Sequence, residues 1–277
     1  MANTINWGQA AVENTIDYGQ GATDNTISWG KSQTLSPSGE TNITGSGGTP
    51  AFTNTKSIAL DGIDDSVTMG NPSSLQFTST VSMSAWFKTT DTTSTQVIIG
   101  KEAITSGNRS YMLYYSGTGG SFTIKFLIFT SGNANNQAVS TSTVTDGNWH
   151  HVLGVNDGTD LKIYIDGILE DTNVGGGGAI QSSTADFFIG RRGNSSSSNR
   201  EYWNGNIDEV AVWNSDQSAN ASAIYGSGVP TSLATYNSIS WWRCGDGDTA
   251  PTLTDNGSGG NNGTMTNFST FSTDVPT

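Results

Sequence analysis

Carboxylate side chains that could bind a hard cation occur at two places in the chain. Asp61, Asp64 and Asp65 lie within five residues of one another, and Asp208 stands two residues before Val210. Calcium selects carboxylate and carbonyl oxygens, which loops of β-proteins supply. On a strand Asp208 would share the inward face with Val210, where a carboxylate must be paired, hydrogen-bonded or metal-bound. We therefore predict Asp61, Asp64 and Asp208 as calcium ligands.

Each of these acids also has a structural explanation that the sequence leaves open. Asp61 to Asp65 reads as a turn, in which Asp side chains accept hydrogen bonds from nearby backbone N–H groups. Asp208 could instead pair with Arg191, with Arg192 or with backbone donors.

Catalytic chemistry is not indicated by the spacing of the acids and histidines. Glycoside hydrolysis needs two carboxyl groups about 5 to 10 Å apart across the scissile bond. Adjacent acids such as Asp208 and Glu209 would face opposite sides of a regular strand. The chain has two histidines, His150 and His151, but it lacks a Gly-x-Ser-x-Gly element whose serine a histidine could activate as a nucleophile. We therefore expect a protein that is not an enzyme.

Aromatic residues beside polar or charged residues provide the candidate sugar-binding site. A sugar ring packs on an aromatic face while polar side chains take its hydroxyl groups. Tyr114, Arg192 and Trp203 are the predicted ligand-binding residues. The alternative for any one of these aromatics is a place in the core.

Composition excludes several kinds of partner. The chain has 277 residues with 11 Lys and Arg against 24 Asp and Glu, a net charge of −13. Such a surface repels phosphate backbones, so we expect no nucleic-acid partner. No apolar run approaches the ~18 residues of a membrane-spanning helix, and residues 1–8 have neither the basic region nor the apolar region of a secretory signal. We expect no membrane insertion.

Short alternating runs joined by polar turns predict an all-β fold. The chain contains 35 Gly, and its hydrophobic residues alternate with polar ones over 81–88, 122–128 and 161–166. This pattern is typical of an antiparallel sandwich or barrel. Only 218–225 reads as helical.

Several ordered motifs resemble those of laminin-G-like domains, which have the concanavalin A-like jelly-roll fold. The resemblance covers residues 56–226 and implies an antiparallel jelly-roll β-sandwich; several such domains bind calcium. The motifs are Ser57–Val67, Met83–Lys88, Trp149–Val152, Leu161–Gly167 and Gly205–Asn214. We expect residues 227–277 to be an extension that packs on the sandwich, with Trp241 or Trp242 on an added strand.

A motif of Asn-Thr-Ile, a polar residue, an aromatic and Gly occurs three times in residues 1–35. Its Ile and aromatic residues stand two apart, so on a strand they share a face that one short unit cannot bury alone. We expect this leader to be a β-repeat that anchors the chain or forms a homo-oligomer, with a trimer preferred, and residues 36–55 to be a linker. The paired residues are Ile5 with Trp7, Ile16 with Tyr18, and Ile27 with Trp29.

The leader resembles the N-terminal segments of structural proteins from tailed-phage particles. Joined to a lectin-like domain, it implies a non-enzymatic virion protein of the capsid-decoration, head-fibre or tail-fibre type. Its partners would be other virion proteins and cell-surface glycans, and its location the virion surface. The alternative is a secreted or cell-surface bacterial carbohydrate-binding module.

Overall fold

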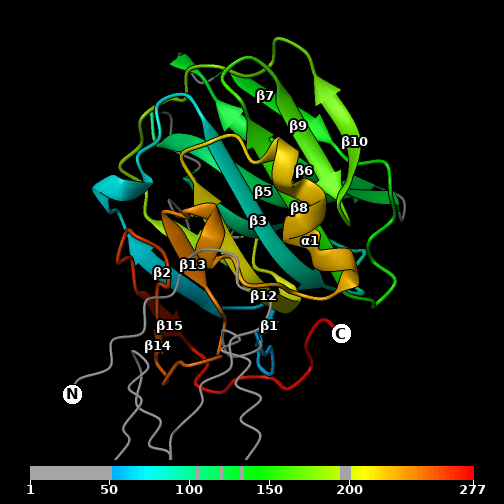
Figure 1. The fold of residues 1–277 in the computed structure, drawn as a ribbon, viewed down its shortest axis with the longest axis vertical. Helices are drawn as coiled ribbons and strands as arrows, with labels where there is room; N and C mark the ends of the chain where they lie inside the picture. Colours follow the sequence, from blue (N-terminus) through cyan, green and yellow to red (C-terminus); the bar gives the residue numbers. More distant parts are fainter. Residues whose placement is uncertain (1–51, 104–106, 119–120, 132–133, 194–200) are drawn as a thin grey trace, which may run out of the picture. The chain divides into compact units, whose positions relative to one another are not determined.

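The computed structural model of the chain describes residues 52–103, 107–118, 121–131, 134–193 and 201–277 (Figure 1). Residues 51–277 make up one compact unit. The predicted oligomerisation residues of the leader, and the repeat itself, lie outside the described residues.

A seven-stranded antiparallel sheet forms one layer of the sandwich. The strands β1 and β13 pair with different parts of β12, at the same edge of the sheet. The order is β1 (Ile58–Asp61), β12 (Asn204–Trp213), β3 (Val81–Lys88), β8 (His150–Asn156), β9 (Leu161–Ile165) and β10 (Ile168–Asn173), with β13 (Ser240–Trp242) beside β12.

An eight-stranded antiparallel sheet forms the other layer. Its order is β14 (Thr252–Leu253), β15 (Gly263–Thr266), β2 (Ser66–Gly70), β11 (Phe187–Ile189), β4 (Gln96–Glu102), β5 (Arg109–Thr118), β6 (Ser121–Phe129) and β7 (Asn135–Val139). The predicted antiparallel jelly-roll sandwich is confirmed.

The hydrophobic core lies between the two sheets and follows the alternation of the sequence. On β6 the side chains of Ile124, Phe126 and Ile128 are buried in the main core, whereas Leu127 and Phe129 belong to a separate cluster. Successive side chains of a strand point to opposite faces, so these two residues lie on the outer face of the sheet.

Helical structure is short and lies outside the sheets. The predicted helical segment is confirmed as η3 (Ser218–Asn220) followed by α1 (Ala221–Tyr225), which covers the outer face of the seven-stranded sheet (Figure 1). Fully described turns of 3₁₀-helix elsewhere include η1 (Ser73–Leu75), η4 (Gly226–Gly228) and η5 (Ala234–Tyr236). Within the described residues no helix is long and apolar enough to cross a membrane.

The C-terminal segment extends both sheets. On one side Trp241 and Trp242 lie on β13, opposite Ala211 and Val210 of β12, as the sequence predicts. On the other side β15 pairs with β2, with Met265 opposite Val67. The last 40 residues are therefore part of the sandwich.

A bulge in β12 overturns the expected orientation of Asp208. Asp208 lies opposite Trp86, but Ala211 lies opposite Ser84, so β12 holds one extra residue, and Glu209 has a φ of 46°. Directly opposed residues share a face, and Trp86 packs against Tyr225 of α1 on the outer side of the sheet. Asp208 thus points to the outer face and not inward, because the bulge breaks the alternation.

Candidate functional site

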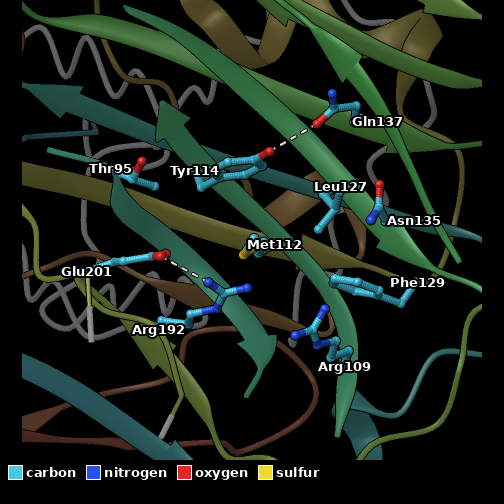
Figure 2. A pocket seen from close by; sticks show the side chains of 10 residues that line it. All are labelled: Thr95, Arg109, Met112, Tyr114, Leu127, Phe129, Asn135, Gln137, Arg192 and Glu201. Carbon is cyan, nitrogen blue, oxygen red and sulfur yellow. Dashed lines mark hydrogen bonds and ion pairs between the residues drawn. The ribbon is translucent and has the colours of Figure 1, made fainter. Parts of the chain in front are cut away.

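A pocket of about 210 Å³ lies on the outer face of the eight-stranded sheet, over β4 to β7 (Figure 2). Its wall is completed by Arg192, which follows β11, and Glu201, which precedes β12. The lining residues are Thr95, Arg109, Met112, Tyr114, Leu127, Phe129, Asn135, Gln137, Arg192 and Glu201.

The register of three strands brings the floor of the pocket together. Met112 of β5 lies opposite Leu127 of β6, which lies opposite Gln137 of β7. One step along, Phe129 lies opposite Asn135. Because side chains opposite each other share a face, three strands deliver an apolar floor and a polar edge side by side.

The floor is a small hydrophobic cluster separate from the main core. Met112, Leu127 and Phe129 are 3%, 4% and 2% exposed, and Tyr114 packs beside them. A Cβ at Gly100 would lie 2.6 Å from Cβ of Met112, so the bare backbone of β4 makes room for this side chain.

A network of ionised side chains forms one wall. Arg192 donates from Nη2 to Glu102 Oε1 (2.9 Å), from Nε to Glu102 Oε2, and from Nη1 to Glu201 Oε1 (2.9 Å). The Arg109 guanidinium lies 3.4 Å from Glu102 and stacks 5.1 Å from the centre of the Phe129 ring. Three charge-assisted hydrogen bonds hold Arg192 in one orientation.

Glu201 is the carboxylate of this network that faces the pocket. Its side chain is 21% exposed, whereas that of Glu102 is 1% exposed. Burial raises the pKa of Glu201, and the Arg192 charge opposes this effect. Within the described part of the chain, its Oε2 atom has no hydrogen-bond partner.

Two of the three predicted ligand-binding residues, Tyr114 and Arg192, line this pocket. Tyr114 donates its hydroxyl to Gln137 Oε1 (2.9 Å), which leaves the Gln137 amide N–H groups for a ligand (Figure 2). Burial raises the pKa of Tyr114, so its hydroxyl stays protonated at neutral pH.

The prediction that Trp203 is a ligand-binding residue is wrong. Its side chain is fully buried, with its ring 5.8 Å from that of Phe87 and 6.2 Å from that of Tyr115. A ring with no exposed surface is not a platform for a ligand, and Trp203 is a core residue.

Sequence reasoning missed most of the pocket, although part of the signal is present. The strand alternation over 122–128 already separates Leu127 and Phe129 from the core residues, and two large apolar side chains on an outer face indicate a covered or binding surface. Nothing local indicates Glu201, which comes from a segment far away in the chain.

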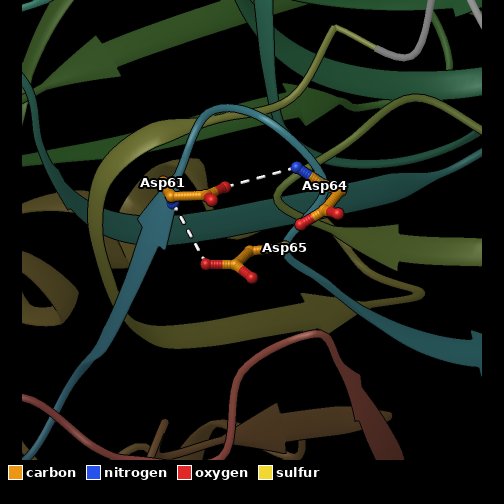
Figure 3. Close-up of side chains that lie close together, drawn as sticks. All are labelled: Asp61, Asp64 and Asp65. Atoms are coloured by element: carbon orange, nitrogen blue, oxygen red, sulfur yellow. Dashed lines mark hydrogen bonds between the residues drawn. The ribbon is translucent and has the colours of Figure 1, made fainter.

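The acidic turn after β1 brings Asp61 and Asp64 together as predicted, along with Asp65. Ligand atoms of these three residues lie within 4.8 Å of one another (Figure 3). Asp61 Oδ1 accepts hydrogen bonds from the backbone N–H of Ile63 (2.8 Å) and Asp64 (3.2 Å), the turn chemistry that the sequence left open. The hydrogen bond from Ile63 lowers the pKa of Asp61.

The charges of this turn are compatible with a cation. Burial and the charge of Asp61 raise the pKa of Asp65, so the carboxylates repel each other. Each side chain still has oxygen lone pairs beyond those used in the turn. A hard cation would relieve the repulsion and take these oxygens as ligands.

Asp208 lies apart from this acidic turn, and within the described residues no second cluster of metal-ligating side chains forms around it. Asp61 lies opposite Asn204, and Asp208 lies four residues further along β12, roughly 13 Å away. Asp208 is fully buried and accepts hydrogen bonds from Nδ2 of Asn54 (2.8 Å) and from the backbone N–H of Glu209 (2.8 Å). Of the two structural alternatives, the backbone donor is therefore the one found, and Arg192 instead binds Glu102 and Glu201.

Comparison of the sequence with known protein families agrees with the jelly-roll motifs of residues 56–226. The sequence profile of the concanavalin A-like lectin/glucanases superfamily matches residues 61–221, more than half of the chain. The chain belongs to this superfamily. No curated protein matches the full sequence significantly.

Comparison with solved structures finds several that are similar to the chain. The "putative carbohydrate binding protein from Bacteroides ovatus ATCC 8483" matches with a TM-score of 0.62 and 19% identity, over 81% of this chain and 62% of that protein. Domains LG4-5 of the mouse laminin α1 chain match with a TM-score of 0.42 and 13% identity, over 57% of this chain and 41% of the laminin chain. The heptameric SAP-like pentraxin of Limulus polyphemus matches with a TM-score of 0.40 and 17% identity, over 60% of this chain and 84% of the pentraxin chain. This chain spans less than two thirds of the Bacteroides protein.

Membership in the concanavalin A-like superfamily assigns a fold but no activity, because one fold hosts many functions. The carboxyl groups of the pocket limit its chemistry. Both oxygens of Glu102 accept hydrogen bonds from Arg192, which leaves Glu201 as the carboxyl group able to meet a ligand. One available carboxyl group cannot supply both the acid and the second carboxylate of glycoside hydrolysis.

A second pair of acids in this superfamily member is closed to solvent. Asp208 is 0% and Glu209 is 2% exposed. Glu209 accepts hydrogen bonds from Trp241 Nε1 (2.5 Å) and Arg243 Nε (3.2 Å). Burial raises the pKa of Glu209 to about 7 and that of Asp208 well above its usual range. The side chains that cover these two acids separate them from solvent.

Proposed function

We propose that the chain is a glycan-binding module that holds a sugar in the pocket over β4 to β7 without cleaving it. The observation that carries the proposal is the juxtaposition of an apolar floor with a polar rim. Met112, Leu127 and Phe129 form the floor, and Asn135 and Gln137 stand at its edge. Sugar rings combine apolar C–H faces with hydroxyl groups at their edges, which fits this arrangement.

The size of the pocket favours a single sugar ring. Its volume of about 210 Å³ is below the roughly 300–1,000 Å³ typical of sites for drug-sized ligands. We therefore expect the pocket to take one residue of a glycan while the rest of the glycan extends into solvent.

Binding without hydrolysis follows from the state of the carboxyl groups. Glu102 accepts hydrogen bonds from the Arg192 guanidinium, and Glu201 accepts one from the same group. The name of the Bacteroides protein also supports a carbohydrate ligand, although its resemblance to this chain is one of fold.

Glycan binding is tested with residues 51–277 as well as the full chain, since 51–277 make up a compact unit. Binding to an immobilised panel of glycans is expected for the wild-type protein and is expected to be weakened in Asn135→Ala, which truncates an exposed side chain at the polar rim. Intact glycans should be recovered after long incubation. A blank panel for both proteins, with and without EDTA, would contradict the proposal, and released sugar would contradict the absence of catalysis.

A calcium ion is part of the proposal, held by Asp61 and Asp64 with Asp65 beside them. Their oxygens lie close enough to share one ion, and their mutual repulsion favours a cation. Bound calcium would supply charge neutralisation and rigidity to the turn between β1 and β2.

The module is displayed on the surface of a tailed-phage particle, where residues 1–35 anchor or trimerise the chain and contact other virion proteins. The three repeats spaced by 11 residues support this assignment. Mass spectrometry of purified phage particles should detect the chain. Deletion of residues 1–35 should reduce the sedimentation coefficient of the isolated protein. An unchanged sedimentation profile would contradict the role of the leader.

The alternative is a secreted or cell-surface bacterial carbohydrate-binding module. It uses the same pocket, so glycan binding does not distinguish the two proposals. Genes for capsid or tail proteins beside the coding sequence would favour the virion, and their absence would favour the bacterial module.

A further inference from the structure

The arginines of the proposed sugar pocket are paired with carboxylates. Arg109 and Arg192 contribute two positive charges and Glu102 and Glu201 two negative charges, while Lys125 Nζ lies 5.8 Å from the centre of the Tyr114 ring. Arg192 donates hydrogen bonds to both glutamates, so its charge is neutralised before a ligand arrives. The carboxylate of Glu201 therefore decides what a ligand meets at this wall of the pocket.

Glu201 presents an acceptor to a ligand. Its Oε1 atom accepts from Arg192 (2.9 Å), while its Oε2 atom is buried without a hydrogen-bond partner in the described part of the chain. An ionised carboxylate only accepts hydrogen bonds, and a buried acceptor without a donor is unfavourable. Because the side chain is 21% exposed and lines the pocket, a ligand hydroxyl there would supply the donor that Oε2 lacks.

A ligand carboxylate would meet the opposite situation. It also only accepts hydrogen bonds, so it gains nothing from Glu201 Oε2 and is repelled by its charge. Glu102 lies behind Arg192 and adds a second negative charge at close range. The net charge of −13 on the whole chain acts in the same direction at longer range.

We infer that Glu201 is a specificity-determining residue that makes the pocket select neutral sugars and reject uronic acids and other anionic sugars. The inference rests on the proposed glycan-binding function and adds the ligand class. In it, Glu201 accepts a hydrogen bond from a sugar hydroxyl and excludes a carboxylate at the same position.

Matched ligands separate this inference from the glycan-binding proposal itself. Methyl glycosides of galactose and glucose are compared with those of galacturonate and glucuronate, which differ only in the oxidation of C6. Dissociation constants are measured by calorimetry for wild type, Glu201→Gln and the control Asp216→Asn. Asp216 is exposed on the loop after β12 and does not line the pocket, so the control removes the same charge elsewhere.

We expect the wild-type protein to bind at least one neutral glycoside about tenfold or more tightly than its uronate, since one unfavourable charge contact is worth about a factor of ten. Glu201→Gln should reduce this ratio to near one, and Asp216→Asn should leave it unchanged. A wild-type protein that prefers uronates would overturn the inference while sustaining the glycan-binding proposal. Absence of binding in all three proteins would overturn both.

Acidic pH provides a second measurement that needs no substitution. Because the pKa of Glu201 is raised by burial, protonation should weaken the discrimination of the wild-type protein at about pH 5, where uronates remain ionised. The Glu201→Gln protein should show no such change. Discrimination that stays constant in the wild-type protein from neutral to acidic pH would contradict the role of Glu201.

Discussion

Asp208 and Glu209 are adjacent on β12, yet both bury their carboxyl groups on the outer face of the seven-stranded sheet. The extra residue of the bulge, with Glu209 at a φ of 46°, turns two neighbouring side chains to the same side. Asn54 covers Asp208, and Trp241 and Arg243 cover Glu209. Two buried acids so close together repel each other when both are ionised, which makes the stability of the fold depend on pH.

The buried pair should lower the free energy of unfolding as pH rises. A carboxyl group whose pKa is raised in the folded state holds a proton there that the unfolded chain releases, so its stabilising contribution is lost as pH rises through the folded pKa, about 7 for Glu209. Asp208→Asn should remove the repulsion and leave the variant more stable than wild type at pH 9 by on the order of 1–3 kcal/mol.

Urea denaturation at acidic and alkaline pH measures this effect as a difference between the two proteins. The comparison between variants is needed because burial lowers the pKa of His151 to about 4, which favours folding as pH rises from there to the ordinary range of histidine. Asp216→Asn is the control for loss of one exposed charge. An Asp208→Asn protein that loses its advantage as pH rises would refute the interpretation.

Tyr114 should contribute to glycan binding through its ring. Tyr114→Ala is expected to weaken binding about fivefold, because an aromatic contact is worth about 1 kcal/mol. Tyr114→Phe removes the hydrogen bond to Gln137 and should weaken binding less. Surface plasmon resonance on a glycan surface provides the measurement, with Tyr236→Ala, in the cluster under α1, as the control. Equal effects of the alanine changes at Tyr114 and Tyr236 would argue against the pocket.

Trp203 should affect stability and leave binding unchanged in the folded protein. Its buried ring contacts Phe87 and Tyr115, so Trp203→Ala should lower the free energy of unfolding by about 3–5 kcal/mol. Trp203→Phe keeps much of the packing and should retain the wild-type dissociation constant for glycans. Denaturant titration and binding measured on the same samples distinguish the two effects. A specific loss of binding in a stable Trp203→Phe protein would restore its predicted role as a platform.

Calcium should stabilise the domain through the acidic turn. At a calcium concentration about 100-fold above the dissociation constant, the expected gain is about 2.7 kcal/mol, which thermal unfolding detects as a higher midpoint. The double variant Asp61→Asn with Asp64→Asn should lose this gain, and EDTA should reverse it in the wild-type protein. Asp208→Asn should keep it, since that residue lies far along β12. An equal response of the double variant and wild type would place calcium elsewhere.

The sequence by itself determined the class of fold and most of its elements. Alternation of apolar and polar residues separates Ile124, Phe126 and Ile128 from Leu127 and Phe129, because successive side chains on any strand face opposite ways. The ordered motifs of residues 56–226 indicated the jelly roll that the superfamily match confirms.

Only the tertiary structure decided which side chains meet. The pocket depends on the register of β4 to β7 and on Arg192 and Glu201, which lie well apart in the sequence from the strands that they face. The burial of Trp203 depends on contacts with Phe87 and Tyr115, which lie far away in the sequence. The bulge at Glu209 was hidden because an extra residue in one strand is detected only from its pairing with the neighbouring strand. Local spacing sets the faces of a regular strand, whereas pairing between distant strands decides whether the strand is regular and what covers each face.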